Sequence, residues 1–110
     1  MAAADKPDLS QALDRLWSRF LPEIEQRIAI LETAAAEFAA HTLSTEQCEA
    51  ATSAAHKLAG VLGVFGLARG THLARELENL YSSKAAPEPA LGARLASLAA
   101  ELRALVESRG

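Results

Sequence analysis

The chain has 110 residues, a length that suits one domain with its own hydrophobic core. Half of its residues are hydrophobic but only 5% are aromatic, which predicts an all-α fold with a core of alanine and leucine. The net charge of −3 and the lack of any cluster of lysine and arginine exclude nucleic-acid binding as the main function. No apolar run reaches the roughly 18 residues of a membrane span, so we expect a soluble, cytoplasmic protein that does not bind membranes.

The start of the chain predicts a short helix behind a flexible end. Residues 1–7 are small and polar, and we expect them to form a flexible N-terminus before a helical bundle domain over residues 8–110. Asp8 and Gln11 resemble a capping pair, and they are followed by apolar residues at helical spacing. This pattern predicts a short amphipathic helix from Asp8 to Phe20.

A proline separates this helix from the next apolar stripe. Pro22 is expected to kink the chain or to start a second helix, because proline lacks an amide hydrogen but suits the first turn of a helix. Apolar residues with a seven-residue period over 24–38 then predict a long bundle helix. Residues 41–43, which include a loop histidine, form a short connection. Ser44 and Gln47 make a plausible capping box that opens the next helix.

That next helix carries the most informative pattern in the chain. Its apolar residues recur at spacings of three and four, which predicts a stripe that faces the core: Cys48, Ala51, Ala55, Leu58, Leu62 and Phe65. At about 100° per residue, His56 lies roughly 130° from the centre of this stripe. We therefore expect the imidazole to point outwards, with Ser53, Gly60 and Gly63 on the same side of the helix.

Two glycines follow His56 at successive turns and allow two interpretations. Glycine inside a helix costs about 0.5–1 kcal/mol relative to alanine, so its presence requires a reason. Bare backbone at Gly60 and Gly63 would let another macromolecule approach the imidazole closely. Alternatively, either glycine marks the end of the helix.

Two further helices complete the predicted domain. After a connection near residues 63–66, the apolar residues between Leu73 and Tyr81 predict one helix, with His72 on its charged surface. Residues 82–89 read as turn and linker, and leucines at heptad spacing over 91–105 predict the last helix. We favour a bundle core over a homodimeric coiled coil for this stripe, since about three heptads are short for an independent zipper. The elements together predict an antiparallel up-down-up-down four-helix bundle with a short extra N-terminal helix laid against one end.

The residues around His56 also carry a family resemblance. The run Ala55-His56-Lys57-Leu58-Ala59-Gly60, then residues 63–67 and 73–78, resembles the signature of histidine-containing phosphotransfer (HPt) domains. The chain departs from the family pattern at Val61, where many members carry a small hydroxyl residue or alanine, and at Ala59, where many carry lysine.

The resemblance implies a function and a set of site residues. It implies that His56 is phosphorylated, that Lys57 is a nearby cation, and that Gly60 is the small residue over which a receiver domain docks. We expect the remaining neighbours of the phosphoryl group or of the docked partner to be Ser53, Ala59 and Gly63. The implied partners are response-regulator receiver domains and a hybrid sensor histidine kinase, and we expect a monomer. In the family the receiver brings the Mg²⁺ site, so we expect no cofactor or metal in this chain.

The residues themselves favour a passive carrier over an enzyme. The sequence has no Walker-type loop, no nucleotide-binding fingerprint and no acidic cluster placed for Mg²⁺. A neutral imidazole is available near neutral pH and is nucleophilic enough to take a phosphoryl group. One alternative is a non-catalytic helical interaction or scaffolding bundle of the same fold. A third hypothesis, a metal-binding bundle that uses His41, His56 and His72, is disfavoured because these positions do not converge.

Overall fold

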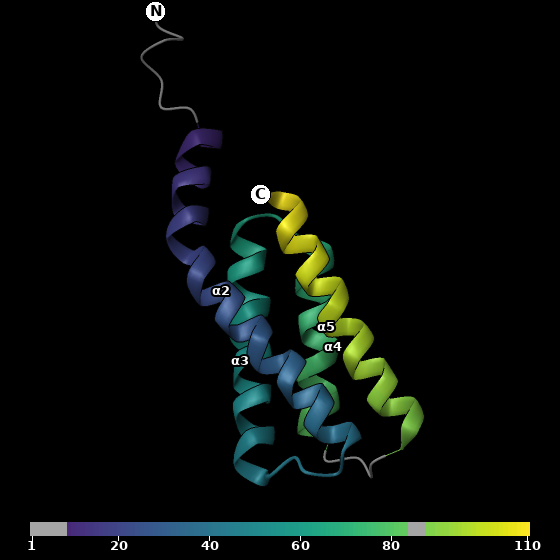
Figure 1. Cartoon of the computed structure of the whole chain (residues 1–110). Coiled ribbons are helices and arrows are strands. Elements are labelled where there is room, and N and C mark those ends of the chain that lie inside the picture. Colours follow the sequence, from purple (N-terminus) through teal and green to yellow (C-terminus); the bar gives the residue numbers. More distant parts are fainter. Residues whose placement is uncertain (1–8, 84–87) are drawn as a thin grey trace, which may run out of the picture.

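The computed structural model describes residues 9–83 and 88–110, which form four helices (Figure 1). These helices are α2 (Leu9–Ala39), α3 (Thr45–Val64), α4 (Ala68–Ser82) and α5 (Pro89–Arg109). The predicted flexible N-terminus over residues 1–7, the capping residue Asp8 and part of the predicted linker, residues 84–87, lie outside the described residues.

The helices form an antiparallel bundle in which each one packs against two neighbours. Consecutive helices run in opposite directions, and α5 returns to pack against α2 and so closes the ring (Figure 1). The most extensive packing is between α3 and α4. The predicted all-α class and up-down-up-down topology are therefore confirmed.

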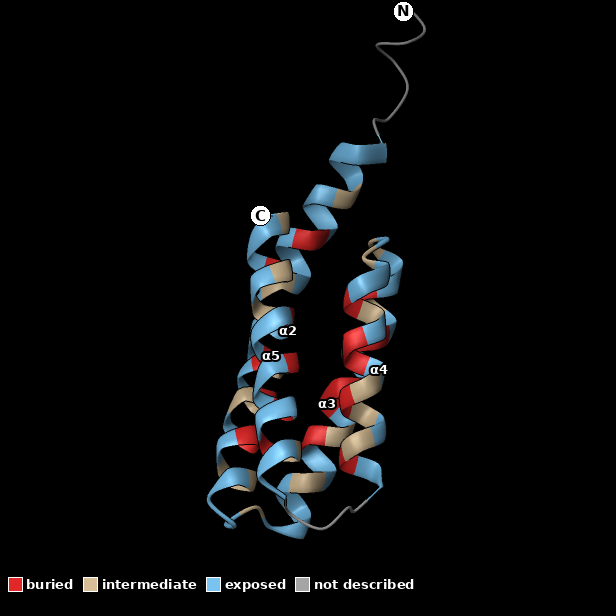
Figure 2. Ribbon diagram, turned by 90° about the vertical axis from the view of Figure 1, so that its right-hand side faces the viewer, coloured by how far each residue is buried: buried red, intermediate tan, exposed pale blue. Residues whose placement is uncertain are grey.

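The bundle surrounds a core of leucine, isoleucine and alanine. Buried residues line the inward sides of the helices and exposed residues cover the outside (Figure 2). Within the described residues no polar or charged side chain is buried, apart from the tryptophan and tyrosine of the core cluster. Burying one large aliphatic side chain stabilises the fold by about 1.5–3 kcal/mol. The largest aliphatic side chains that are fully buried are Ile24, Ile28, Leu31, Leu58, Leu62, Leu77, Leu95, Leu98 and Leu102.

The separate N-terminal helix predicted before Pro22 is wrong as an independent element. Residues 9–39 form one continuous helix with Pro22 inside it. The axis of α2 changes direction in its first half (Figure 1), which agrees with the other alternative, a kink. The helix continues because its apolar stripe continues: Trp17 is buried on the same side as Ile24.

Both ends of α3 have well-defined caps. The Ser44 hydroxyl accepts a hydrogen bond from the Gln47 amide at 3.1 Å, and the Gln47 side chain accepts one from the Ser44 amide at 2.8 Å. This capping box is the one predicted from the sequence. At the other end, Gly66 adopts a φ of 72°, and the Leu67 amide donates to the Leu62 carbonyl at 3.0 Å. A left-handed glycine of this kind ends a helix with little strain, and it confirms the predicted connection.

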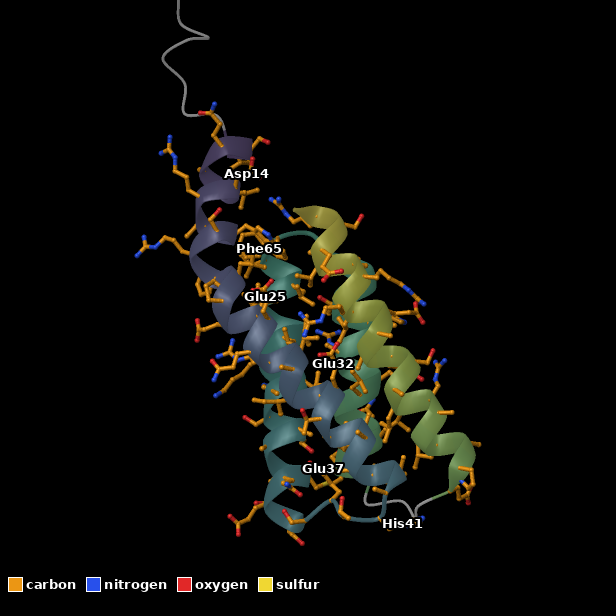
Figure 3. The ribbon with its side chains drawn as sticks, viewed as in Figure 1. Asp14, Glu25, Glu32, Glu37, His41 and Phe65 are labelled. Carbon is orange, nitrogen blue, oxygen red and sulfur yellow. The ribbon has the colours of Figure 1, made fainter. Side chains whose placement is uncertain are left out.

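Side-chain contacts join the first half of α2 to the end of α5 and to the segment that follows α3. The ring of Trp17 packs edge-on against Phe65, with centroids 5.1 Å apart, and the guanidinium of Arg109 lies over the same indole. Arg109 also donates to Asp14 at 2.9 Å, so three segments meet at the end where Asp14 and Phe65 lie (Figure 3). None of the described helices is both long enough and apolar enough to cross a membrane.

One two-point ion pair links α2 to α5. The Arg103 guanidinium donates to both oxygens of Glu32, at 2.7 and 3.0 Å. These hydrogen bonds hold the pKa of Glu32 below its usual range. Both side chains remain partly exposed, so the pair contributes little to stability.

Candidate functional site

The inner face of α3 determines where His56 lies. Ala51, Ala55, Leu58 and Leu62 are fully buried and fix the rotation of the helix about its axis. The side chain of His56 is on the opposite side and is 73% exposed. The outward orientation predicted from the spacing of the apolar residues is therefore confirmed.

A carboxylate on the neighbouring helix holds the imidazole of His56. The His56 Nδ1 atom lies 2.9 Å from Oε2 of Glu78, whose side chain is 29% exposed. An ionised carboxylate can only accept hydrogen bonds, so the shared hydrogen belongs to Nδ1. In the neutral ring, Nε2 then carries the free lone pair. The pair with Glu78 thus selects the tautomer that leaves Nε2 as the nucleophilic atom.

The packing between α3 and α4 sets the position of Glu78. Leu77 and Tyr81 are buried on either side of it and anchor this part of α4 in the core. About two turns before Glu78 on α4, the Thr71 hydroxyl donates to the backbone carbonyl of Ala59 at 3.0 Å. Glu78 is therefore held by a rigid helix and not by a loop, which gives a stable orientation to its partner.

Glu78 is the site residue to which sequence reasoning assigned no role. It stands at the end of the run that carries the family resemblance, but it is 22 residues from His56 in the sequence. Spacing within one helix cannot show a contact between two helices, because that contact depends on their relative register. The only available signal was the presence of an acidic residue in the matching run.

The two predicted glycines differ in their surroundings. Gly60 is exposed and lies inside α3, which continues to Val64, so the helix-end explanation does not apply to it. A Cβ atom built on Gly60 would meet nothing within 4 Å, so the described residues do not require glycine there for packing. Gly63 lies in the last turn of α3, where a Cβ atom would come within 3.4 Å of Thr71. Gly63 is still within α3, and the left-handed glycine that ends this helix is Gly66, so the helix-end interpretation does not apply to Gly63 either.

The other predicted site residues divide into exposed and buried positions. Ser53 and Lys57 are exposed on α3, as is His56. Ala59 is only 5% exposed and packs in the core, so its side chain cannot contact a phosphoryl group or a docked partner. Its inclusion in the predicted site is corrected on this ground.

The three histidines do not form a shared site. His41 is exposed in the loop between α2 and α3, with a φ of 61°, and His72 is exposed on α4. Within residues 9–83 and 88–110, no three side chains of histidine, cysteine, aspartate or glutamate are grouped so that they could hold a metal ion.

Comparisons with known proteins agree with this geometry. The family model of the Hpt domain matches residues 15–108, which is most of the chain. The chain therefore belongs to the Hpt domain family, the resemblance seen around His56 is confirmed, and the family has a phosphotransfer role in phosphorelays.

Part of the chain is also similar to a curated protein. The chain is 38% identical over 66 residues to Protein RcaC of Microchaete diplosiphon. The matched part is 60% of this chain but only 10% of that protein, so the chain corresponds to a small part of its relative. No solved structure matches the chain significantly.

Proposed function

We propose that the protein is a phosphocarrier of a two-component phosphorelay, which accepts a phosphoryl group at His56 from the aspartate of one receiver domain and donates it to another. The observation that carries the proposal is the exposed imidazole whose Nδ1 is paired with Glu78, because this pairing leaves Nε2 free for attack. Membership of the Hpt domain family supports the same role.

The transfer step follows from this arrangement. The Nε2 lone pair attacks the phosphorus of the receiver's aspartyl phosphate, an N–P bond forms, and the bond from phosphorus to the aspartate oxygen breaks. The aspartate leaves as a carboxylate on the receiver. The imidazole ring gains positive charge and keeps its hydrogen on Nδ1, where the Glu78 carboxylate stabilises it. Donation to a second receiver is the reverse of this step.

The partner supplies the rest of the chemistry. A receiver domain brings the Mg²⁺ that neutralises the charge on the transferred group, and this chain adds the Lys57 ammonium beside His56. The open backbone at Gly60, one turn after His56, gives the receiver room to approach. We also propose that the protein is a cytoplasmic monomer and that it has no ATP or metal site of its own. Its proposed partners are receiver domains and a hybrid sensor histidine kinase.

The test is phosphorylation by a receiver domain. When the protein is incubated with a phosphorylated receiver, it should gain an acid-labile label, as expected for phosphohistidine. His56→Gln should keep wild-type helicity but gain no label, because the exposed side chain leaves no cavity when it is replaced. His72→Gln, which changes another exposed histidine, is the matched control and should be labelled normally.

Two outcomes would contradict the proposal. If the wild-type protein gained no label from any receiver of its source organism, a scaffolding bundle of the same fold would be the better explanation. If His72→Gln lost the label and His56→Gln kept it, the phosphorylated residue would be wrongly assigned.

A further inference from the structure

A cavity of about 750 Å³ opens between α3 and α4, and His56 and Glu78 are among the residues that line it. It extends to the end of the bundle where His41 lies, far from Asp14 (Figure 3). Its apolar floor comes from α2, the following loop, α4 and α5, through Phe38, Leu43, Leu80 and Leu95. Sites for small molecules in proteins have volumes of about 300–1,000 Å³ and mostly apolar walls, so this cavity has the dimensions of a binding site.

Small residues on α3 explain why the cavity exists. The first half of α3 presents Cys48 and Thr52 to this space, where a leucine would fill it. The Thr52 hydroxyl donates to the Cys48 carbonyl at 2.9 Å, and the Cys48 thiol donates to the Tyr81 carbonyl at 3.2 Å. Both polar groups already have partners in the protein. The α3 side of the cavity at Cys48 and Thr52 therefore offers mainly apolar surface to a ligand.

Among the described residues that line the cavity, the carboxylates Glu49 and Glu78 are the charged side chains, apart from the histidines His41 and His56. Glu49 and Glu78 line it from α3 and α4, and none of its described lining residues is a lysine or an arginine. Glu49 lies seven residues before His56, which is two turns along the same side of α3. Burial raises the pKa of Tyr81, so its phenol stays neutral and adds no charge. An apolar floor with two carboxylates beside it is complementary to a cation that has an apolar body.

We propose that this cavity binds a small amphipathic cation, a protonated amine on an aromatic or aliphatic body. The body lies against Phe38, Leu43 and Leu95, and the ammonium group lies between Glu49 and Glu78. An ammonium group at Glu78 competes with Nδ1 of His56 for the same carboxylate. Occupancy therefore frees the imidazole from its orienting partner and slows transfer at His56, a consequence that rests on the proposed function.

Binding is tested with two probes that have the same ring system and opposite charge. The cation is 1-naphthylmethylamine and the anion is 1-naphthoic acid, each titrated into the ¹⁵N-labelled protein and followed by two-dimensional NMR. The amine should cause saturable shifts of backbone amides in residues 48–56 and 78–82, and the acid should not. Absence of saturable binding by the amine, or equal binding of the two probes, would overturn the proposal.

Variants of the lining place the ligand in this cavity. Thr52→Leu fills the space and should weaken amine binding at least tenfold while circular dichroism keeps the wild-type helicity. Glu49→Gln removes one carboxylate and should weaken binding by about two- to fivefold, as expected for a partly exposed charge pair. Glu46→Gln is the matched control, because Glu46 is exposed on α3 outside the lining, and its binding should be unchanged. Wild-type affinity in folded Thr52→Leu, or in Glu49→Gln, would contradict the proposed position.

The regulatory consequence has its own readout. At saturating amine, the rate at which a phosphorylated receiver labels His56 should fall severalfold, while the acid at the same concentration should have no effect. If the amine binds by NMR but the labelling rate is unchanged, the regulatory part of the inference is wrong. If no label forms with or without the amine, the proposed function fails, and the binding site is still judged by the NMR titrations alone.

Discussion

The two faces of α3 have different tasks, and two residues in the same turn show the difference. Leu58 is fully buried against the other helices, whereas His56, two positions earlier, has a side chain that is 73% exposed and touches Glu78. The inner face fixes the position of the helix, and the outer face carries the reactive atom. Substitutions on the inner face should therefore act mainly on the free energy of unfolding, and substitutions on the outer face mainly on transfer at His56.

The largest effect is expected on the inner face. Leu58→Ala removes a fully buried side chain and should lower the free energy of unfolding by about 2–5 kcal/mol. His56→Gln should change it by no more than about 0.5 kcal/mol, because the replaced side chain is exposed. Urea unfolding of the two variants measures both values. Equal destabilisation by the two substitutions would contradict the separation of the faces.

The next effect concerns the residue that orients His56. Glu78→Ala removes the acceptor of the Nδ1 hydrogen, and we expect transfer at His56 to slow by about 10- to 100-fold, the range found when a metal-binding histidine loses the residue that orients it. Glu78→Gln should lose less, since an amide oxygen can still accept this hydrogen bond. Rapid-quench measurements of labelling by a phosphorylated receiver give the rates.

A second carboxylate on α4 serves as the control for this prediction. Glu76 pairs with Arg94 of α5 and does not touch His56. Glu76→Ala should therefore transfer at the wild-type rate. If Glu76→Ala and Glu78→Ala were slowed equally, the effect would come from the charge of α4 in general and not from the pair with His56.

Gly60 tests whether the outer face needs close approach. Gly60→Gln should leave the protein as stable as the wild type or up to about 1 kcal/mol more stable, because glycine is the poorer helix former and the space around it is open. Transfer from a receiver should nevertheless slow by about tenfold or more, since misplacing reacting atoms by 1 Å can cost about 100-fold. Thermal unfolding and the labelling rate are measured on the same variant. If the labelling rate of Gly60→Gln equalled that of the wild type, close approach of the receiver would not explain the glycine at this position.

The smallest effect is expected at Lys57. Adjacent helical residues point about 100° apart, so Lys57 does not stack over His56, although its long side chain can bring an ammonium group towards a phosphoryl oxygen. Lys57→Ala should slow transfer by a few fold at low ionic strength, which corresponds to about 0.2–1 kcal/mol for one exposed charge interaction. Added salt should shrink the difference. Kinetics equal to the wild type at low salt would leave the partner as the sole source of stabilising charge.

Features that depend on one helix could be predicted from the sequence. The spacing of apolar residues on α3 predicted which side of the helix faces the core, and hence the exposure of His56. The capping box at Ser44 and Gln47 followed from residue types three positions apart. Both are local features, in which geometry within about one turn decides the outcome.

Features that depend on packing between helices could not be predicted in the same way. The contact between His56 and Glu78 and the cavity that both residues line depend on the register of α3 against α4. The sequence predicted that Ala59, three residues after His56, lies near the site. Packing between the helices instead buries its side chain in the core. Pro22 was one possible start of a new helix. The helix continues through Pro22 because the buried residues of α2 lie on one side of the helix both before and after it.

In the proposed mechanism, Nε2 of His56 receives the phosphoryl group because Glu78 occupies Nδ1. The direct measurement is NMR of the phosphorylated protein with ¹⁵N-labelled histidine, in which couplings between phosphorus and nitrogen and between nitrogen and the ring hydrogens identify the bonded nitrogen. We expect one phosphohistidine, at position 56, with phosphorus on Nε2 and hydrogen on Nδ1. Phosphorus on Nδ1 of His56, or on any other residue, would contradict it.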